Sequence, residues 1–276
     1  MGRTKILIPK TDLEKLYLHR KWSPAKIAQK YGCTSITIRN RLIEADISLK
    51  SKSAAQTKYP RKDFSGSDID KAYLLGFKYG DLNAYVPPGV SETVVVRCHT
   101  THLAQERLFK ELFCQYGTVT ISRNSRSAHL NCYLNRSFTF LLGKYPPGMR
   151  RWLSSNETLL WAFAAGYIDA EGTFGLNQGK GRFKIDAYDQ AILADIHKLF
   201  LRSGIRSKSR IIARKGDNDY GWIWKQNVWR VSVNESSSLE VLIFLLKPFL
   251  THQKRVSDAN KVLSNIQQRR RNGTII

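Results

Sequence analysis

Two acidic residues of this chain, Asp81 and Glu171, each directly follow an apolar segment with the features of a helix. The segments span residues 73–80 and 163–170, and each holds two small residues spaced four apart just before the acid. These small residues are Gly76, Gly80, Gly166 and Ala170. Residues four apart share one face of a helix, so two helices packed through these faces could approach very closely.

Such packing would place the two carboxylates side by side at the helix ends. The C-terminal end of a helix already carries about half a negative charge, and adjacent carboxylates repel each other. The arrangement therefore calls for a cation, and oxygen ligands without His or Cys suit Mg²⁺ or Mn²⁺. In a chain with a net charge of +23, this chemistry points to metal-dependent hydrolysis of a phosphodiester.

The elements around the acids form an internal repeat. Each half is predicted to run helix, strand, strand, helix, strand, strand, helix, and residues 145–148 (Tyr-Pro-Pro-Gly) mark the joint. Ser154 and Glu157 have the spacing of a capping box that would open the second half. We predict an α+β protein with domains at 68–148 and 149–276. The predicted strands are 83–86, 92–101, 118–123 and 128–136 in the first half, and 173–177, 183–188, 206–213 and 227–233 in the second.

The two acid-bearing segments resemble the motif of LAGLIDADG homing endonucleases in their monomeric, two-motif form. The second copy, 164–172, is a close match, whereas the first, 74–81, departs from the pattern at Lys78 and Leu82. The resemblance extends over about residues 68–268. It implies two pseudo-symmetric αββαββα domains whose curved antiparallel sheets lie along the DNA major groove.

The resemblance also implies roles for individual residues. Asp81 and Glu171 match the family's catalytic, metal-binding acids, and Mg²⁺ would support cleavage of both strands of a long target. Relatives often place Lys or Gln at the end of the second strand of each half, where this chain has residues 97–99 and 186–188 (Arg-Cys-His and Asp-Ala-Tyr). His99, Lys184 and Lys254 are therefore the candidates for catalytic support.

Alternation along the predicted strands gives each sheet one polar, largely basic face, although any half-solvated sheet would alternate in the same way. Arginine, asparagine and serine on such a face can read base edges or grip phosphates. The candidate DNA contacts there are Asn131, Tyr133, Asn135, Arg206, Lys208, Arg210, Arg230, Ser232 and Asn234.

Residues 1–47 form a separate, small all-α unit in this reading. Ser23 and Pro24 can open its second helix, Gly32 can end that helix, and Thr34 can cap a third. The segment resembles the helix-turn-helix of resolvase-like proteins and transcription regulators, although a plain three-helix unit would show the same caps. Its third helix would present Ser35, Thr37, Arg39, Asn40 and Arg41 to DNA. Residues 48–67 would be a basic linker.

Composition narrows the function classes. With 45 Lys and Arg against 22 Asp and Glu, the chain suits a polyanionic partner, and 10 of the 23 excess charges lie within residues 1–67. The apolar runs are too short to span a bilayer, and no secretion signal is evident. The sequence contains no C-x-x-C pair and no H-x-x-x-H pair, so neither pattern suggests a zinc site. We expect an intracellular protein.

We predict a monomeric, site-specific endonuclease for double-stranded DNA, of the kind usually borne by introns. The alternative is a relative that binds DNA or intron RNA without cleaving it, as a regulator or a maturase. Lys78, Leu82 and the missing second-strand lysines favour the alternative, and the intact acid pair opposes it.

Overall fold

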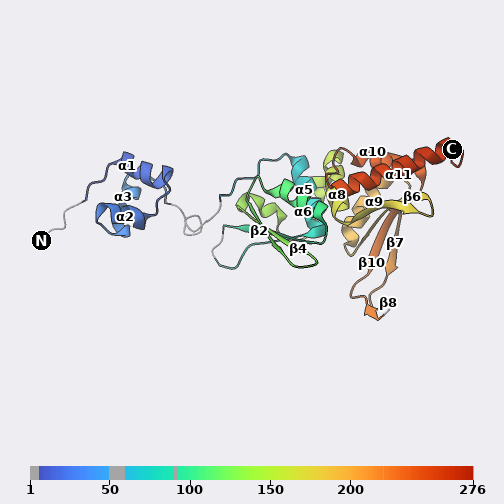
Figure 1. Ribbon diagram of the computed structural model, residues 1–276, viewed down its shortest axis with the longest axis horizontal. Helices are drawn as coiled ribbons and strands as arrows, with labels where there is room; N and C mark the ends of the chain where they lie inside the picture. The colour runs from blue at the N-terminus through green and yellow to red at the C-terminus, as the bar shows by residue number, and fades with distance from the viewer. Residues whose placement is uncertain (1–5, 50–59, 90–91, 220, 276) are drawn as a thin grey trace. The chain divides into compact units, whose positions relative to one another are not determined.

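The structure is a computed structural model that describes residues 6–49, 60–89, 92–219 and 221–275. The chain divides into two compact units. One comprises residues 1–59 with 88–92, and the other comprises 60–87 with 93–276 (Figure 1). Lys50, Lys52 and Lys58 of the expected linker lie outside the described residues.

The first unit packs its helices around a small apolar core of Leu and Ile side chains with Ala28 and Tyr17. Ser23 caps helix α2 (Pro24–Tyr31) by accepting a hydrogen bond from the Lys26 backbone N–H, as its position in the sequence predicts. Gly32 ends that helix with φ of 61°, a left-handed conformation that glycine adopts without strain. The elements are α1 (Lys10–Glu14), the π-helical turn η1 (Lys15–His19), α2 (Pro24–Tyr31) and α3 (Ser35–Glu44).

The second unit contains two four-stranded antiparallel sheets with the same topology, which confirms the α+β class and the repeat. The first sheet has the order β1-β2-β4-β3 and the second β5-β6-β10-β7, so each places its second and fourth strands at the centre. The strands of the first sheet are β1 (Leu82–Tyr85), β2 (Val94–Thr100), β3 (Thr118–Arg123) and β4 (Ala128–Leu134). Those of the second are β5 (Gly172–Asn177), β6 (Lys180–Ala187), β7 (Lys208–Ala213) and β10 (Val228–Val233).

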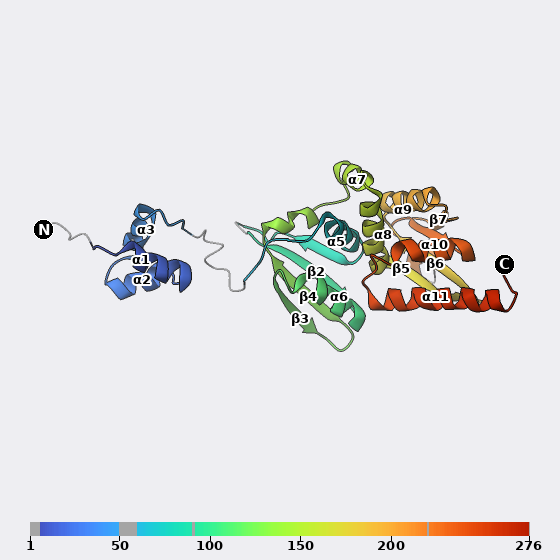
Figure 2. The same cartoon turned by 90° about the horizontal axis from the view of Figure 1, so that it is seen from above.

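Helices α5 (Asp68–Asp81) and α8 (Glu157–Glu171) lie side by side between the two sheets (Figure 2). Helix α8 is buried from Leu159 to Ala170 and α5 from Ala72 to Phe77, in a single apolar core that continues through both halves of the unit. Helices α6 (Leu103–Phe113), α9 (Gln190–Arg202), α10 (Ser236–Leu246) and α11 (Gln253–Arg271) pack on the sheets. The 3-10 helix η2 (Arg136–Leu141) contacts α5 and β2, and α7 (Pro147–Ser154) packs against α8.

Several local expectations were wrong. Ser154 ends the unforeseen helix α7, and Asn156 caps α8 by accepting from the Thr158 backbone N–H. Strand β7 begins at Lys208 rather than Arg206, because its pairing with β10 ends where Lys208 meets Ser232. A short hairpin, β8 (Asn218–Asp219) and β9 (Trp222–Ile223), interrupts the connection between β7 and β10.

The expected linker also differs at its C-terminal end. The Lys62 backbone N–H donates to the carbonyl of Tyr116 at 2.8 Å. The ring of Phe64 packs against those of Tyr116, Phe138 and Phe140. Residues 60–67 are therefore part of the second unit. Across the described ranges, no helix combines the length and apolar composition that crossing a membrane requires.

Candidate active site

Close packing of α5 and α8 depends on one glycine in each helix. A Cβ added at Gly76 would lie 1.9 Å from the carbonyl oxygen of Phe163, and one added at Gly166 would lie 2.0 Å from that of Tyr73. The two contacts are equivalent, since each glycine meets the carbonyl three residues before the other glycine. Only hydrogen fits at these positions, so the helix backbones touch along a pseudo-twofold axis.

The same axis brings the acids together. Further along the helices, a Cβ added at Gly80 would lie 2.3 Å from the Cβ of Ala170 and 3.2 Å from the Cγ of Glu171. Asp81 and Glu171 are the last residues of α5 and α8, so they lie at the same end of the packed pair. This adjacency is the arrangement that the spacing of small residues predicts.

Burial and mutual repulsion both act on the acid pair. Burial, followed by the charges of Asp81 and Asp189, raises the pKa of Glu171 to about 7. Burial likewise raises the pKa of Asp81, although a hydrogen bond from Gln105 opposes this effect. Two carboxylates that are hard to ionise together become ionised when a cation neutralises them.

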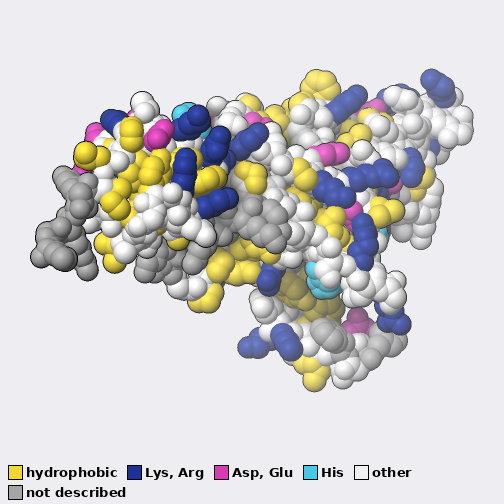
Figure 3. Space-filling view, turned by 60° about the vertical axis from the view of Figure 1, so that its left-hand side comes forward, with side chains coloured by type: hydrophobic (Ala, Val, Ile, Leu, Met, Phe, Trp, Pro, Cys, Tyr) yellow, Lys and Arg dark blue, Asp and Glu magenta, His cyan; other side chains and the backbone are white. Residues whose placement is uncertain are grey.

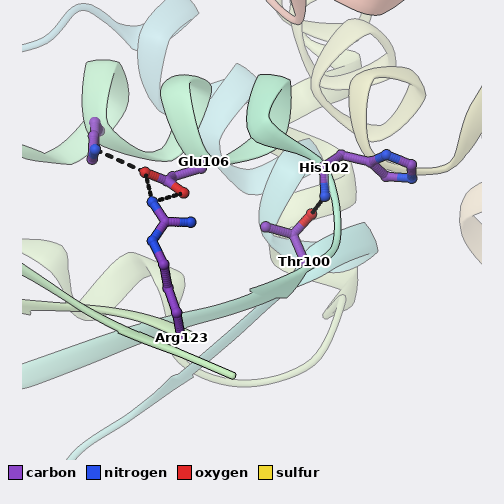
Figure 4. A network of polar contacts seen from close by, with 5 residues as sticks. Thr100, His102, Glu106 and Arg123 are labelled. Atoms are coloured by element: carbon purple, nitrogen blue, oxygen red, sulfur yellow. Dashed lines mark hydrogen bonds and ion pairs between the residues drawn. The ribbon is translucent and has the colours of Figure 1, made fainter. Parts of the chain in front are cut away.

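Gln105 was not found by the sequence analysis, yet its amide Nε2 donates to Asp81 Oδ2 at 2.6 Å. It lies on α6, which an ion-pair network fastens to the first sheet (Figure 4). The buried Glu106 carboxylate lies 2.8 Å from Lys110 Nζ and 2.6 Å from Nη2 of Arg123 on β3. At the start of α6, Thr100 Oγ1 accepts from the His102 backbone N–H. These contacts hold Gln105 against the acid.

Asp169 and Tyr79 occupy equivalent positions in the two motif copies but differ in their chemistry. Asp169 is fully buried, and its Oδ2 accepts from the backbone N–H groups of Thr251 at 2.8 Å and His252 at 3.0 Å. The corresponding residue of the first copy, Tyr79, donates its hydroxyl to the carbonyl of Lys144 at 2.8 Å. Asp169 therefore fixes the chain just before α11, and Tyr79 fixes the chain before α7.

Residues 158–246 match the family model described as a LAGLIDADG-like domain. This part of the chain is a LAGLIDADG-like domain. No curated protein matches the chain at a significant level.

Several solved structures resemble the fold. One is of mesophilic variants of the homing endonuclease I-DmoI, with 18% identity, a TM-score of 0.47, and coverage of 66% of this chain and 98% of that one. Another holds I-DmoI with DNA and Mn, at 17% identity and a TM-score of 0.45, covering 65% and 97%. The third is full-length DUF199/WhiA from Thermatoga maritima, at 13% identity and 0.48, covering 75% and 63%. At these values the likeness by itself assigns no activity.

The donor set of the acid pair fits a hard divalent ion. Asp81 and Glu171 offer carboxylate oxygens, and burial raises the pKa of each acid. Within the described ranges, no group of three or more His, Cys, Asp or Glu side chains is placed to hold a metal.

The three candidates for catalytic support are engaged elsewhere. His99 lies on the exposed face of β2, with its ring centroid 4.3 Å from that of His129. Lys184 forms an ion pair with Asp186 at 2.8 Å. Lys254 pairs with Asp258 at 2.6 Å from the exposed side of α11. The neighbouring Arg255, which the sequence analysis missed, instead reaches the carbonyl oxygen of Ala170.

The polar face of the first sheet carries two of the expected contacts. Asn131 and Tyr133 lie there on β4, and Arg97, directly opposite on β2, donates to Asn131 Oδ1 at 2.8 Å. Asn135 follows the strand and is used structurally. Its Oδ1 accepts from the Ser137 backbone N–H as the cap of η2, and its Nδ2 donates to Asp63.

The polar face of the second sheet is more basic but contains one acid. Register places Arg210 beside Arg230 and Lys208 beside Ser232 on this face. Asp186 accepts two hydrogen bonds of 2.6 Å from Arg230, so that guanidinium is held in place. Arg206 precedes β7 and pairs with Glu235 at 3.0 Å, and Asn234 is exposed just after β10. Lysine and arginine side chains are spread over the surface seen in Figure 3, with few acids between them.

Helix α3 of the first unit exposes most of its expected face. Ser35, Arg39 and Asn40 are exposed and Thr37 is half-buried. Arg41 was expected to face outward, but its side chain is only 13% exposed. Its Nε donates to the carbonyl of Ile6 at 3.0 Å and its Nη1 pairs with Glu44, since position 41 faces the chain that leads into α1.

Proposed function

We propose that the protein is a site-specific endonuclease that hydrolyses both strands of a duplex DNA target with Mg²⁺ or Mn²⁺. The observation that carries the proposal is the acid pair, because Asp81 and Glu171 lie together at the ends of helices that pack through glycine. The basic sheet faces and the LAGLIDADG-like domain support a DNA substrate.

The sheet faces would bind the duplex through arginine, lysine and amide side chains, so that the scissile phosphates lie at the acid pair. Arg97 donates to Asn131 Oδ1, and both side chains carry groups that can pair with a base edge. A divalent ion bound at the acids would activate water and stabilise the charge that develops on the phosphate. The chain's own part is to hold both carboxylates at that point through Gly76 and Gly166, and to orient Asp81 through Gln105.

The first unit would add a second DNA contact through α3. Ser35, Thr37, Arg39 and Asn40 suit a major groove and its phosphates. Tethering this unit to the nuclease would raise the affinity for a long site without any new contact in the catalytic unit. In this proposal the chain acts as a monomer, because it contains both motif copies.

The test begins by selecting bound duplexes from a randomised library with the whole chain. The selected DNA is then incubated with the protein and Mg²⁺ or Mn²⁺. We expect double-strand cleavage by the native chain, whereas Asp81→Asn and Glu171→Gln should abolish cleavage and retain binding. Glu240→Gln is the matched control, because this acid pairs with Arg270 on the outer helices. Bound DNA that stays intact in both metals would refute the nuclease proposal.

A binding protein without cleavage is the second candidate. Two observations favour it: Asp189 adds negative charge beside Glu171, and Lys184 is held by Asp186. In that case the library would yield a binding site that neither metal cleaves. Competition with structured RNA would then separate a DNA-binding regulator from an RNA maturase.

A further inference from the structure

Two histidines lie directly opposite each other on the polar face of the first sheet. His99 on β2 and His129 on β4 are register partners in neighbouring antiparallel strands, and both are exposed. Their ring centroids are 4.3 Å apart, with an angle of 35° between the ring planes. Across the described ranges, neither imidazole forms a hydrogen bond or an ion pair with the chain. The ring nitrogens are therefore available to a ligand from outside.

The strand register holds the two rings within reach of one ion. β2 and β4 are the central strands of the sheet, and their pairing runs without a break from Val94 opposite Leu134 to Thr100 opposite Ala128. Side chains directly opposite on one face have Cβ atoms about 4.5–5.5 Å apart. A divalent ion lies about 2.0–2.1 Å from an imidazole nitrogen that binds it, so a single ion can bridge two rings at this separation.

The nearest arginine on this face is turned away from the histidines. Arg97 lies two residues before His99 and donates to Asn131 Oδ1 at 2.8 Å. Its guanidinium carbon lies 5.0 Å from the ring centroid of Tyr85, and Tyr85 is the register partner of Val95. The guanidinium is therefore directed toward the opposite end of β2. Its positive charge does not occupy the space beside the two imidazoles.

We propose that His99 and His129 form a two-ligand site for a borderline-soft divalent ion such as Zn²⁺, Ni²⁺ or Cu²⁺. Neutral imidazole suits these ions, whereas Mg²⁺ and Ca²⁺ prefer oxygen ligands. The chemistry thus differs from that of the Asp81–Glu171 pair, and the inference does not rest on the proposed function. Two protein ligands, rather than the four of a structural zinc site, would make binding reversible.

The test is titration of the whole chain, without an affinity tag, with Zn²⁺ in competition with a chromophoric chelator. Saturating Mg²⁺ competes for carboxylate sites, and a Cys114→Ser background removes an exposed thiol. At about pH 7.5 an ordinary imidazole is mainly neutral. We expect His99→Gln or His129→Gln to weaken Zn²⁺ binding at least about tenfold. His19→Gln is the matched control, since His19 is an exposed histidine on η1, and its substitution should leave this affinity unchanged.

A double variant distinguishes one shared ion from two independent imidazoles. If both rings hold the same ion, removing either ring destroys the chelate. The variant with both His99→Gln and His129→Gln should then bind Zn²⁺ only slightly more weakly than either single variant. Independent rings would instead contribute additive shares of the bound zinc, and that result would overturn the proposal. Unchanged Zn²⁺ affinity in both single variants would overturn it as well.

Cu²⁺ gives a direct readout of the ligands in the native chain. The electron paramagnetic resonance spectrum with less than one equivalent of Cu²⁺ should show coupling to two nitrogens, and either single variant should lose the two-nitrogen pattern. A native spectrum without this coupling would contradict the proposal. In EDTA each variant should keep its Tm within about 1 °C of the native value, because substitutions on an exposed surface rarely change stability much.

Discussion

Replacing Gly76 with alanine tests the geometry that brings the acids together. The added Cβ would lie 1.9 Å from the carbonyl oxygen of Phe163, whereas a carbon and an oxygen approach to about 3.3 Å at closest. The helices would have to separate by roughly 1.4 Å, a gap that removes much of the dispersion energy along their contact. The obstacle is backbone, so no rotamer change relieves it.

The expected cost follows from two opposing effects. Overpacking a core costs about 1–3 kcal/mol, and the backbone obstacle places Gly76→Ala at or above the upper end. Alanine returns about 1 kcal/mol through its higher helix propensity. The net loss of about 2 kcal/mol corresponds to a fall in Tm of about 4–8 °C for a unit of this size. Separation of Asp81 from Glu171 should also reduce the rise in Tm that Mg²⁺ produces.

Calorimetry of three variants checks this reasoning. Gly148→Ala is the control, because Gly148 lies in a helix with nothing within 4 Å of the added Cβ, and its Tm should hold or rise slightly. Gly166→Ala should lose as much as Gly76→Ala, since its obstacle lies at 2.0 Å. The double variant should lose less than the sum, because the first substitution already separates the helices. If Gly76→Ala were as stable as Gly148→Ala, the close packing of α5 and α8 would be refuted.

Three further predictions concern other parts of the molecule. In EDTA, the stability of the folded chain should fall as pH rises from 4.5 through about 7, because burial raises the pKa of Glu171 in the folded state and favours its neutral form. In the Glu171→Gln variant, Tm should depend less on pH over this range. Glu106→Gln should cost about 1–2 kcal/mol in urea unfolding, since the exposed cations that it leaves unpaired are readily solvated, and a loss above about 4 kcal/mol would contradict this. Asn40→Ala should weaken DNA binding, measured by fluorescence anisotropy, by up to about 3 kcal/mol. Arg41→Ala should lower stability and leave affinity nearly unchanged, and the reverse pattern for the two residues would refute the assignment of the α3 face.

Features that depend on neighbours in the chain could be predicted from the sequence. The spacing of Gly76 and Gly166 before the acids indicated a close helix pair, because residues four apart share a helix face whatever surrounds them. Ser23 and Gly32 indicated the ends of α2, because capping involves only local backbone groups. The repeat indicated the same succession of helices and strands in both halves, and the two sheets share one topology.

Features that depend on packing between distant segments were decided only by the tertiary structure. Gln105 reaches Asp81 across 24 positions of sequence, and Arg255 reaches Ala170 across 85. No spacing rule connects such residues, since their approach follows from how α6 and α11 dock on the core. Arg41 turned inward for the same reason, because a distant carbonyl at Ile6 accepts its N–H. The acids of the candidate site are thus fixed by local sequence, and the groups that tune those acids are fixed by the fold.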